Sequence, residues 1–101
     1  MPWIEKLFQT PIEDYRKHAR DLIIIPYLVV CRGMTERNEI FDIVMQWADK
    51  CNELKRLEPS RHEFSIRIRS RIDDVMRERI PPMTLQTLRQ KNQYLYETLR
   101  I

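Results

Sequence analysis

The chain has 101 residues, a length that fits one compact domain. It holds one glycine, Gly33, against six prolines, so few positions suit the positive φ angles of tight hairpins and phosphate-binding loops. A β-rich fold is therefore disfavoured. Neither glycine-rich nucleotide motif, G-x-G-x-x-G or G-x-x-x-x-G-K-[ST], can be written with one glycine, so any nucleotide site must work without such a loop.

The charge is unevenly placed along the chain. Charged residues make up 33% and apolar residues 43%, as in folded proteins built from amphipathic helices. The net charge is +3, and residues 55–71 carry six Lys or Arg against two Glu. Arg outnumbers Lys thirteen to five, and its planar guanidinium suits two-point contact with phosphate. This basic segment is where we expect an anionic partner to bind.

The cysteine pattern does not favour a metal site. Cys31 and Cys51 form no C-x-x-C pair, and His18 and His62 are isolated. Both cysteines have apolar neighbours, so we expect two buried thiols, a reducing cytoplasm and no structural metal. The longest apolar run, residues 22–31, is about half the ~20 residues that a membrane span needs, and no targeting segment is visible.

The first half of the chain predicts two helical stretches. Residues 3–8 predict a short helix. Thr10 then predicts a helix start, because Pro11 follows at the first helical position and Glu13 completes a capping box. Apolar residues at steps of three and four continue to Pro26, where we expect the helix to kink or break near residue 25 and then a buried apolar continuation.

Turn and cap signals divide the rest of the chain. Gly33 punctuates it, and Thr35 predicts the cap of a long helix over residues 36–57. Ser60 begins another capping box and a helix that the Pro81-Pro82 pair ends by about residue 80. Two short helices follow in the tail. The sequence therefore predicts an all-α fold, a small bundle of three main helices plus short terminal helices, in a single domain over residues 1–101.

Catalytic sets of residues are weak in this sequence. Ser60 and His62 are two residues apart and do not face each other on a helix, and the side chains of Asp73 and Asp74 point ~100° apart. We expect no catalysis by this chain alone.

Arginine gives the better signal. On the third main helix, Arg67 and Arg71 lie along one edge of the apolar stripe and Arg69 along the opposite edge. Two arginines on one edge could grip a phosphate, and the alternative is that they pair with Glu63 and Asp74. Six aromatic residues are candidate base-stacking faces, with a place in the core as the alternative: Trp3, Tyr15, Tyr27, Trp47, Tyr94 and Tyr96.

Four blocks in order resemble archaeal primase accessory domains. They are Trp3-Ile4-Glu5-Lys6-Leu7-x-x-Thr10-Pro11-Ile12-x-Asp14-x-Arg16-Lys17, Ile25-Pro26-Tyr27-Leu28, Trp47-x-x-Lys50-Cys51-Asn52-Glu53-Leu54, and Pro82-Met83-Thr84-Leu85-x-x-Leu88-x-x-Lys91-Asn92-x-x-Leu95-Tyr96. The chain is similar to the noncatalytic subunit X of archaeal primase and to the helix-bundle domain of archaeal plasmid primase–polymerase replication proteins. It departs from that pattern at Tyr15, often Gly, and at Gln93, often Pro.

The resemblance implies a helical module related to the C-terminal part of primase large subunits, without their iron–sulfur cysteines. It implies binding of the initiating nucleoside triphosphate (ATP or dNTP, accompanied by Mg²⁺) and of single-stranded DNA template, for a separate primase–polymerase catalytic domain. The expected nucleotide-binding residues are Asp14, Arg16, Lys17, Lys50 and Asn52 by motif position, with Cys51 in the same block, and Arg67 and Arg71 from the helix pattern. The expected DNA-binding residues are Trp3, Lys6, Trp47, Arg69, Lys91 and Asn92.

Two other functions stay open at this point. One is a structural bundle that joins a primase catalytic domain to a helicase or partner subunit. The other is a regulator that binds double-stranded DNA, which the modest charge and the lack of helix-turn-helix spacing disfavour. We expect a monomeric domain, excised from a larger replication protein.

Overall fold

The computed structural model describes residues 1–99, and every regular element in that range is helical. The elements are α1 (Pro2–Phe8), α2 (Arg16–Ala19), the π-helical segments η1 (Arg20–Ile24) and η2 (Tyr27–Cys31), α3 (Arg37–Leu54), α4 (Arg61–Glu78), α5 (Leu85–Lys91) and α6 (Gln93–Thr98). The predicted all-α fold is confirmed. Within residues 1–99, no helix has the length and apolar character needed to cross a membrane.

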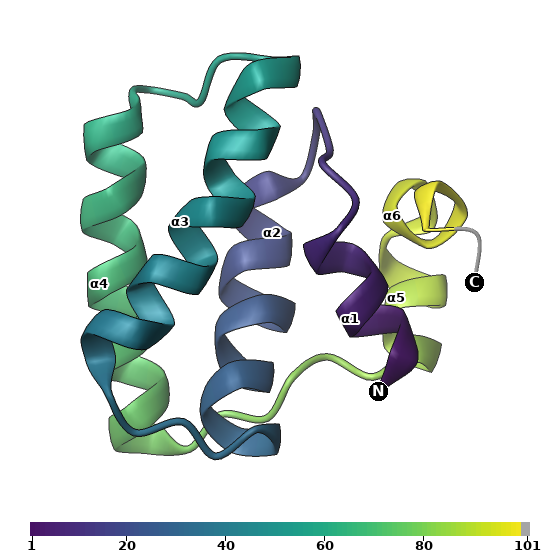
Figure 1. The fold of residues 1–101 in the computed structure, drawn as a ribbon. Helices are drawn as coiled ribbons and strands as arrows, with labels where there is room; N and C mark the ends of the chain where they lie inside the picture. The colour runs from purple at the N-terminus through teal and green to yellow at the C-terminus, as the bar shows by residue number, and fades with distance from the viewer. Residues whose placement is uncertain (100–101) are drawn as a thin grey trace.

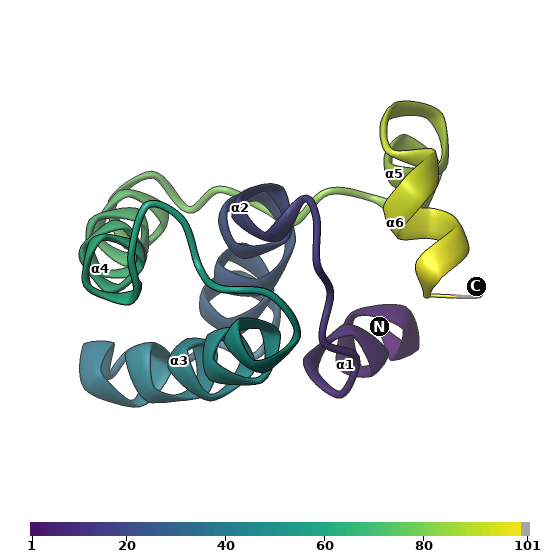
Figure 2. The same cartoon turned by 90° about the horizontal axis from the view of Figure 1, so that it is seen from above.

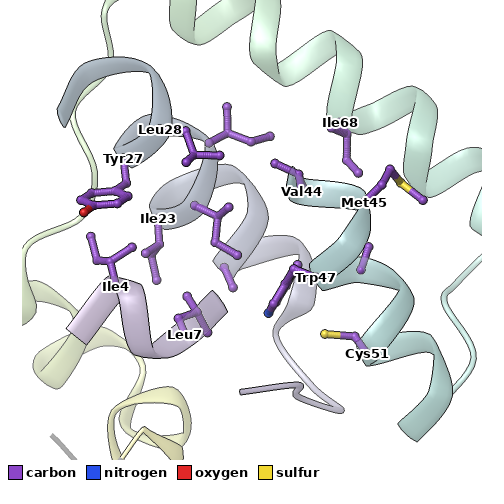
Figure 3. Close-up of a cluster of buried hydrophobic side chains, with 14 of the residues drawn as sticks. Ile4, Leu7, Ile23, Tyr27, Leu28, Val44, Met45, Trp47, Cys51 and Ile68 are labelled. Carbon is purple, nitrogen blue, oxygen red and sulfur yellow. The ribbon is translucent and has the colours of Figure 1, made fainter. Parts of the chain in front are cut away.

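Three long helical segments form the main body of the molecule. The first is α2 with its π-helical continuation, which lies between α4 on one side and α1 on the other (Figures 1 and 2). Helix α3 packs along α4, and α5 and α6 lie on the side away from α4. The core between these helices is drawn in Figure 3; its largest fully buried side chains include Trp47, Phe64, Ile4 and Leu7.

Pro26 lies between η1 and η2 and does not end the helix. An ordinary residue here would donate its N–H to the carbonyl of Leu22 in an α-turn or of Asp21 in a π-turn. Instead, Arg71 Nε donates to the Asp21 carbonyl at 3.0 Å, and the Met83 N–H donates to the Leu22 carbonyl at 2.8 Å. Donors from α4 and from the segment after it therefore replace the missing one, and the buried continuation beyond Pro26 is confirmed.

The predicted helix start at Thr10 is wrong. Thr10 Oγ1 donates to a carbonyl of α1 at 2.8 Å, and the next helix begins only at Arg16. The loop between them buries Ile12, whose N–H donates to Cys51 Sγ at 3.5 Å. Tyr15 ends this loop in the left-handed conformation, at φ 60° and ψ 26°, which a helix cannot continue through. Burial of a loop side chain thus overrides the local capping signal.

Several of the other end signals are confirmed. Gly33 has φ +66°, and beside it the Met34 N–H donates to the Leu28 carbonyl at 3.0 Å, which closes the π-helical segment with a turn one residue wider than a Schellman cap. Ser60 Oγ accepts from the Glu63 N–H at 3.1 Å and begins α4. The two short tail helices are also present.

Three details of the sequence prediction are wrong. Helix α3 is capped by Glu36, whose carboxylate accepts from the Asn38 N–H at 3.1 Å, and Thr35 is not the cap. The helix ends at Leu54 and not at residue 57, because the Asn52 side chain accepts a hydrogen bond from the Leu57 N–H and turns the chain. Cys31 is exposed, since it ends η2 where the chain turns out to solvent, and only Cys51 is a buried thiol.

Candidate functional site

A groove of about 420 Å³ lies between the first long helical segment and α4, and we call it the α2–α4 groove. Lysine and arginine side chains reach it from both walls, and the turn before α4 contributes Pro59 and a carboxylate. Its cationic residues are Lys17, Arg20, Arg67 and Arg71, and its carboxylates are Asp21, Glu58, Glu63 and Asp74. The predicted placement of Arg67 and Arg71 along one edge of α4 is thereby confirmed.

Half of the groove's carboxylates are already paired. Arg20 Nε lies 2.7 Å from Asp21, and an arginine outside the groove, Arg77, lies 3.0 Å from Asp74. Among residues 1–99, no ion pair involves Lys17, Arg67 or Arg71, and none involves the other two carboxylates. The alternative that the two arginines pair with Glu63 and Asp74 is therefore wrong. Three cations stay open to a ligand, against two carboxylates.

Arg20 places a buried positive charge beside this groove. The residue is 3% exposed, its guanidinium lies 4.6 Å from the centre of the Phe64 ring, and two of its nitrogens bind Asp21. Its third nitrogen, Nη1, is buried without a partner among residues 1–99. Sequence reasoning missed Arg20 as a site residue; the available signal was its position three residues after Lys17, on the same helix face.

Arg16 is held by the protein itself. The residue is 8% exposed, and it donates to the carbonyls of Cys51 at 3.1 Å, of Lys55, and of Arg56 at 2.8 Å. These carbonyls lie at and just beyond the end of α3, where a helix lacks its own donors. Arg16 therefore caps α3, and its neighbour in the predicted site, Asp14, is exposed and 3.6 Å from Lys55 Nζ.

The Trp47 block builds the end of α3. Trp47 is 1% exposed in the core (Figure 3), and its indole N–H is buried without a partner among residues 1–99. Cys51 is also buried, and burial raises the pKa of its thiol. Asn52 Oδ1 accepts from the Leu57 N–H at 2.9 Å and turns the chain after the helix. Of the predicted site residues in this block, only Lys50 is exposed, and it lines a separate groove of about 240 Å³.

The predicted DNA-binding residues lie on different helices. Arg69 is on the edge of α4 opposite Arg67, as predicted, and its guanidinium lies 3.8 Å from the centre of the Phe41 ring. Asn92 is 7% exposed, and its Oδ1 accepts from the Leu95 N–H at 3.1 Å, so it caps α6. The others lie on three further helices: Trp3 and Lys6 on α1, Trp47 on α3, and Lys91 at the end of α5.

The aromatic candidates divide by exposure. Tyr27 and Trp47 are core residues, and Trp3 and Tyr96 are half-buried against the core. Tyr15 and Tyr94 are 49% and 40% exposed, and their ring centres are 5.3 Å apart. Tyr15 lines a second groove, of about 300 Å³, which we call the Tyr15 groove.

The comparison with known proteins gives the family. A search of curated proteins finds no match. The model of the family described as Primase X (PriX) matches residues 1–101. The resemblance to primase accessory domains is thereby confirmed, and the chain belongs to the Primase X family.

Proposed function

We propose that this chain binds the phosphates of an initiating nucleoside triphosphate in the α2–α4 groove and so supports primer synthesis by a separate catalytic domain. The observation that carries the proposal is the convergence of Lys17, Arg67 and Arg71 on one groove, with no ion pair to another residue among residues 1–99. Membership of the Primase X family supplies the context of DNA priming.

The side chains of the groove suit a polyphosphate. Arg71 Nε is fixed on the Asp21 carbonyl at 3.0 Å, which holds the guanidinium in place while its terminal nitrogens have no partner among residues 1–99. Arg67 lies one helical turn before Arg71 on α4, and Lys17 adds a point charge from the opposite wall. The volume of about 420 Å³ lies within the range of small-molecule sites.

The two unpaired carboxylates fit the same ligand when it carries its metal ion. Glu58 and Glu63 would repel a bare triphosphate. A triphosphate in solution is accompanied by Mg²⁺, which prefers oxygen ligands and keeps several of its waters. The ion reduces the negative charge that these carboxylates face, so the groove suits ATP·Mg²⁺ or dNTP·Mg²⁺ better than the free anion.

Binding alone can help priming. The first bond of a primer needs two nucleotides and a template strand held together, and much of the difficulty is the entropy of assembling them. A noncatalytic module that holds a triphosphate next to the catalytic domain reduces that cost without bond chemistry of its own. Single-stranded template would bind through phosphate contacts and base stacking.

The test is an NMR titration of the full chain with ATP·Mg²⁺, using two variants of the same helix. Arg67→Ala removes a groove cation, and we expect about tenfold weaker binding, since a hydrogen bond to a charged group contributes about 1.5–3 kcal/mol. Arg69→Ala removes an equal charge from the opposite edge and should change affinity less than about twofold. Unchanged spectra at millimolar ATP, or equal losses in both variants, contradict the proposal.

Primer synthesis by the catalytic domain distinguishes nucleotide binding from the alternative of a structural bundle. If the chain binds initiating nucleotide, Arg67→Ala lowers the amount of primer made at limiting ATP, and excess ATP restores it. If the chain only joins the catalytic domain to a partner protein, primer synthesis is indifferent to Arg67→Ala at every ATP concentration.

A further inference from the structure

Three ring side chains gather on the surface beside the α2–α4 groove. Tyr15 is the middle one: its ring centre is 5.3 Å from that of Tyr94, at an interplanar angle of 42°, and 5.9 Å from that of His18, at 26°. Tyr94 comes from α6, so segments far apart in the chain build the cluster. All three residues are exposed, and the two tyrosines are among the few large apolar side chains that the fold leaves in water.

Tyr15 occupies an unfavourable backbone conformation. Its φ of 60° lies in the left-handed region, where a Cβ atom crowds the following carbonyl at a cost of about 1–2 kcal/mol. Asn and Asp often accept this conformation because their short side chains bond locally, and tyrosine has no such compensation. The core gains little from the ring, since Tyr15 is 49% exposed. Packing within residues 1–99 therefore gives only a partial account of a tyrosine at this position.

The cluster adjoins the proposed phosphate site. The Tyr15 groove is lined by Tyr15 and His18 together with Lys17, with Lys55, which pairs with Asp14 at 3.6 Å, and with the carboxylates Glu13 and Glu58. It shares Lys17, Glu58 and Phe64 with the α2–α4 groove, so the two grooves meet along that boundary. An exposed aromatic ring thus lies next to Lys17, a cation with no ion pair among residues 1–99. This combination suits the base and the phosphates of one nucleotide, or of neighbouring nucleotides in a strand.

We propose that Tyr15 and Tyr94 form a stacking platform for a nucleobase. The base belongs either to the initiating nucleoside triphosphate or to a single strand, and both present the same π-face to the rings. The inference deepens the proposed function, because it assigns the base contact next to the proposed phosphate contact. Stacking of a base on an aromatic side chain corresponds to a change of about 5- to 150-fold in affinity when the ring is removed.

The experiment uses the fluorescence of 2-aminopurine, which is quenched when the base stacks. The full chain is titrated with 2-aminopurine riboside triphosphate and, separately, with a short single strand that carries one 2-aminopurine. Tyr15→Gly removes the ring and suits the left-handed backbone, so this variant keeps the fold. Tyr15→Phe is the matched control that keeps an aromatic face, and Tyr94→Leu tests the second ring. Circular dichroism melts confirm that each variant is folded.

We expect quenching by the unaltered chain and by Tyr15→Phe, with affinities within about twofold of each other. Quenching is lost in Tyr15→Gly and reduced in Tyr94→Leu, and whichever probe is quenched identifies the source of the base. Two results overturn the platform: no quenching of either probe by the unaltered chain, or full quenching by folded Tyr15→Gly.

Inorganic tripolyphosphate with Mg²⁺, which has no base, separates this inference from the proposed function. Its binding should fall in Arg67→Ala and stay unchanged in Tyr15→Gly. Quenching without tripolyphosphate binding supports the platform and contradicts the phosphate site. Tripolyphosphate binding without quenching supports the phosphate site and contradicts the platform.

Discussion

Arg16 and Lys17 are neighbours in the chain, yet they belong to two different regions of the molecule. Arg16 points into the end of α3 and donates to three backbone carbonyls, while Lys17 lines the α2–α4 groove and has no ion pair among residues 1–99. The first sequence block that resembles the primase accessory domains contains both residues, and the resemblance implies nucleotide binding for both. The comparison teaches that one motif can hold a residue needed for folding beside a residue free to bind a ligand.

The cause of the difference is the electrostatics of a helix end. The last carbonyls of α3 lack helical donors and carry the negative end of the helix dipole, so a guanidinium placed there is stabilised. Lys17 is exposed and has no such partner among residues 1–99, so its positive charge is hydrated. If this comparison is right, substitutions in the first region reduce stability and substitutions in the second reduce ligand affinity.

Arg16→Ala should have the largest effect. The substitution removes the side-chain donor of the Lys55 and Arg56 carbonyls and one of two donors of the Cys51 carbonyl, which also accepts from the Lys55 N–H; hydrogen bonds to a charged group contribute about 1.5–3 kcal/mol each. We expect the free energy of unfolding to fall by about 3 kcal/mol, and Tm to fall by about 12 °C or more. Thermal denaturation followed by circular dichroism measures both. A variant that melts within about 2 °C of the unaltered chain would contradict the comparison.

Lys17→Ala should behave in the opposite way. Surface substitutions away from specific contacts usually change stability by less than about 0.5 kcal/mol, so we expect an unchanged Tm. Affinity for ATP·Mg²⁺ should fall by up to about tenfold, and the salt dependence of binding should become shallower. Calorimetric titration at several salt concentrations checks both. If Lys17→Ala instead lowers Tm as much as Arg16→Ala does, the two regions are not distinct.

Asn52→Ala sharpens the boundary of the first region. The Leu57 N–H loses the acceptor that turns the chain after α3, so we expect a loss of about 1 kcal/mol. Lys50→Ala, two residues earlier and exposed, is the matched control and should melt like the unaltered chain. Urea denaturation resolves a difference of this size. Equal stability of the two variants would mean that the Asn52 side chain does not stabilise the fold.

The sequence predicted those parts of the fold that depend on local signals. Ser60, Gly33 and the apolar stripe of α4 act through residues no more than about six positions away, and each was identified correctly. The helix start at Thr10 failed because it depends on the burial of Ile12 against Cys51, thirty-nine residues further along the chain. Local periodicity carries no information about such a contact.

The candidate site was predictable in part for the same reason. Arg67 and Arg71 share one edge of a helix, and helical spacing alone places them together. The capping roles of Arg16 and Asn52 were hidden, because they depend on how the end of α3 meets the first helical segment. Sequence resemblance marks such residues as important and does not say whether they bind a ligand or hold the fold.

Glu5 extends the comparison to a partly exposed carboxylate with a structural contact, and here we expect the smallest effect. Tyr27 donates a hydrogen bond to Glu5, and Arg32 lies beside it, so the pKa of Glu5 is lowered from its ordinary 4.5, first by the Tyr27 hydrogen bond and then by Arg32. A carboxyl group whose pKa is lower in the folded state stabilises the fold above its unfolded pKa. That contribution is lost as pH falls through the folded pKa.

Glu5→Gln should therefore lower Tm at pH 7, and the gap should close as the pH falls below about 4.5 through the lowered pKa. Since the Glu5 side chain is 42% exposed, solvent screening limits the loss to less than about 1 kcal/mol. Glu39→Gln is the control, because Glu39 is exposed and has no ion pair among residues 1–99. Melting curves at several pH values decide the matter: a gap that is constant or widens at low pH would mean that the Glu5 charge does not stabilise the fold.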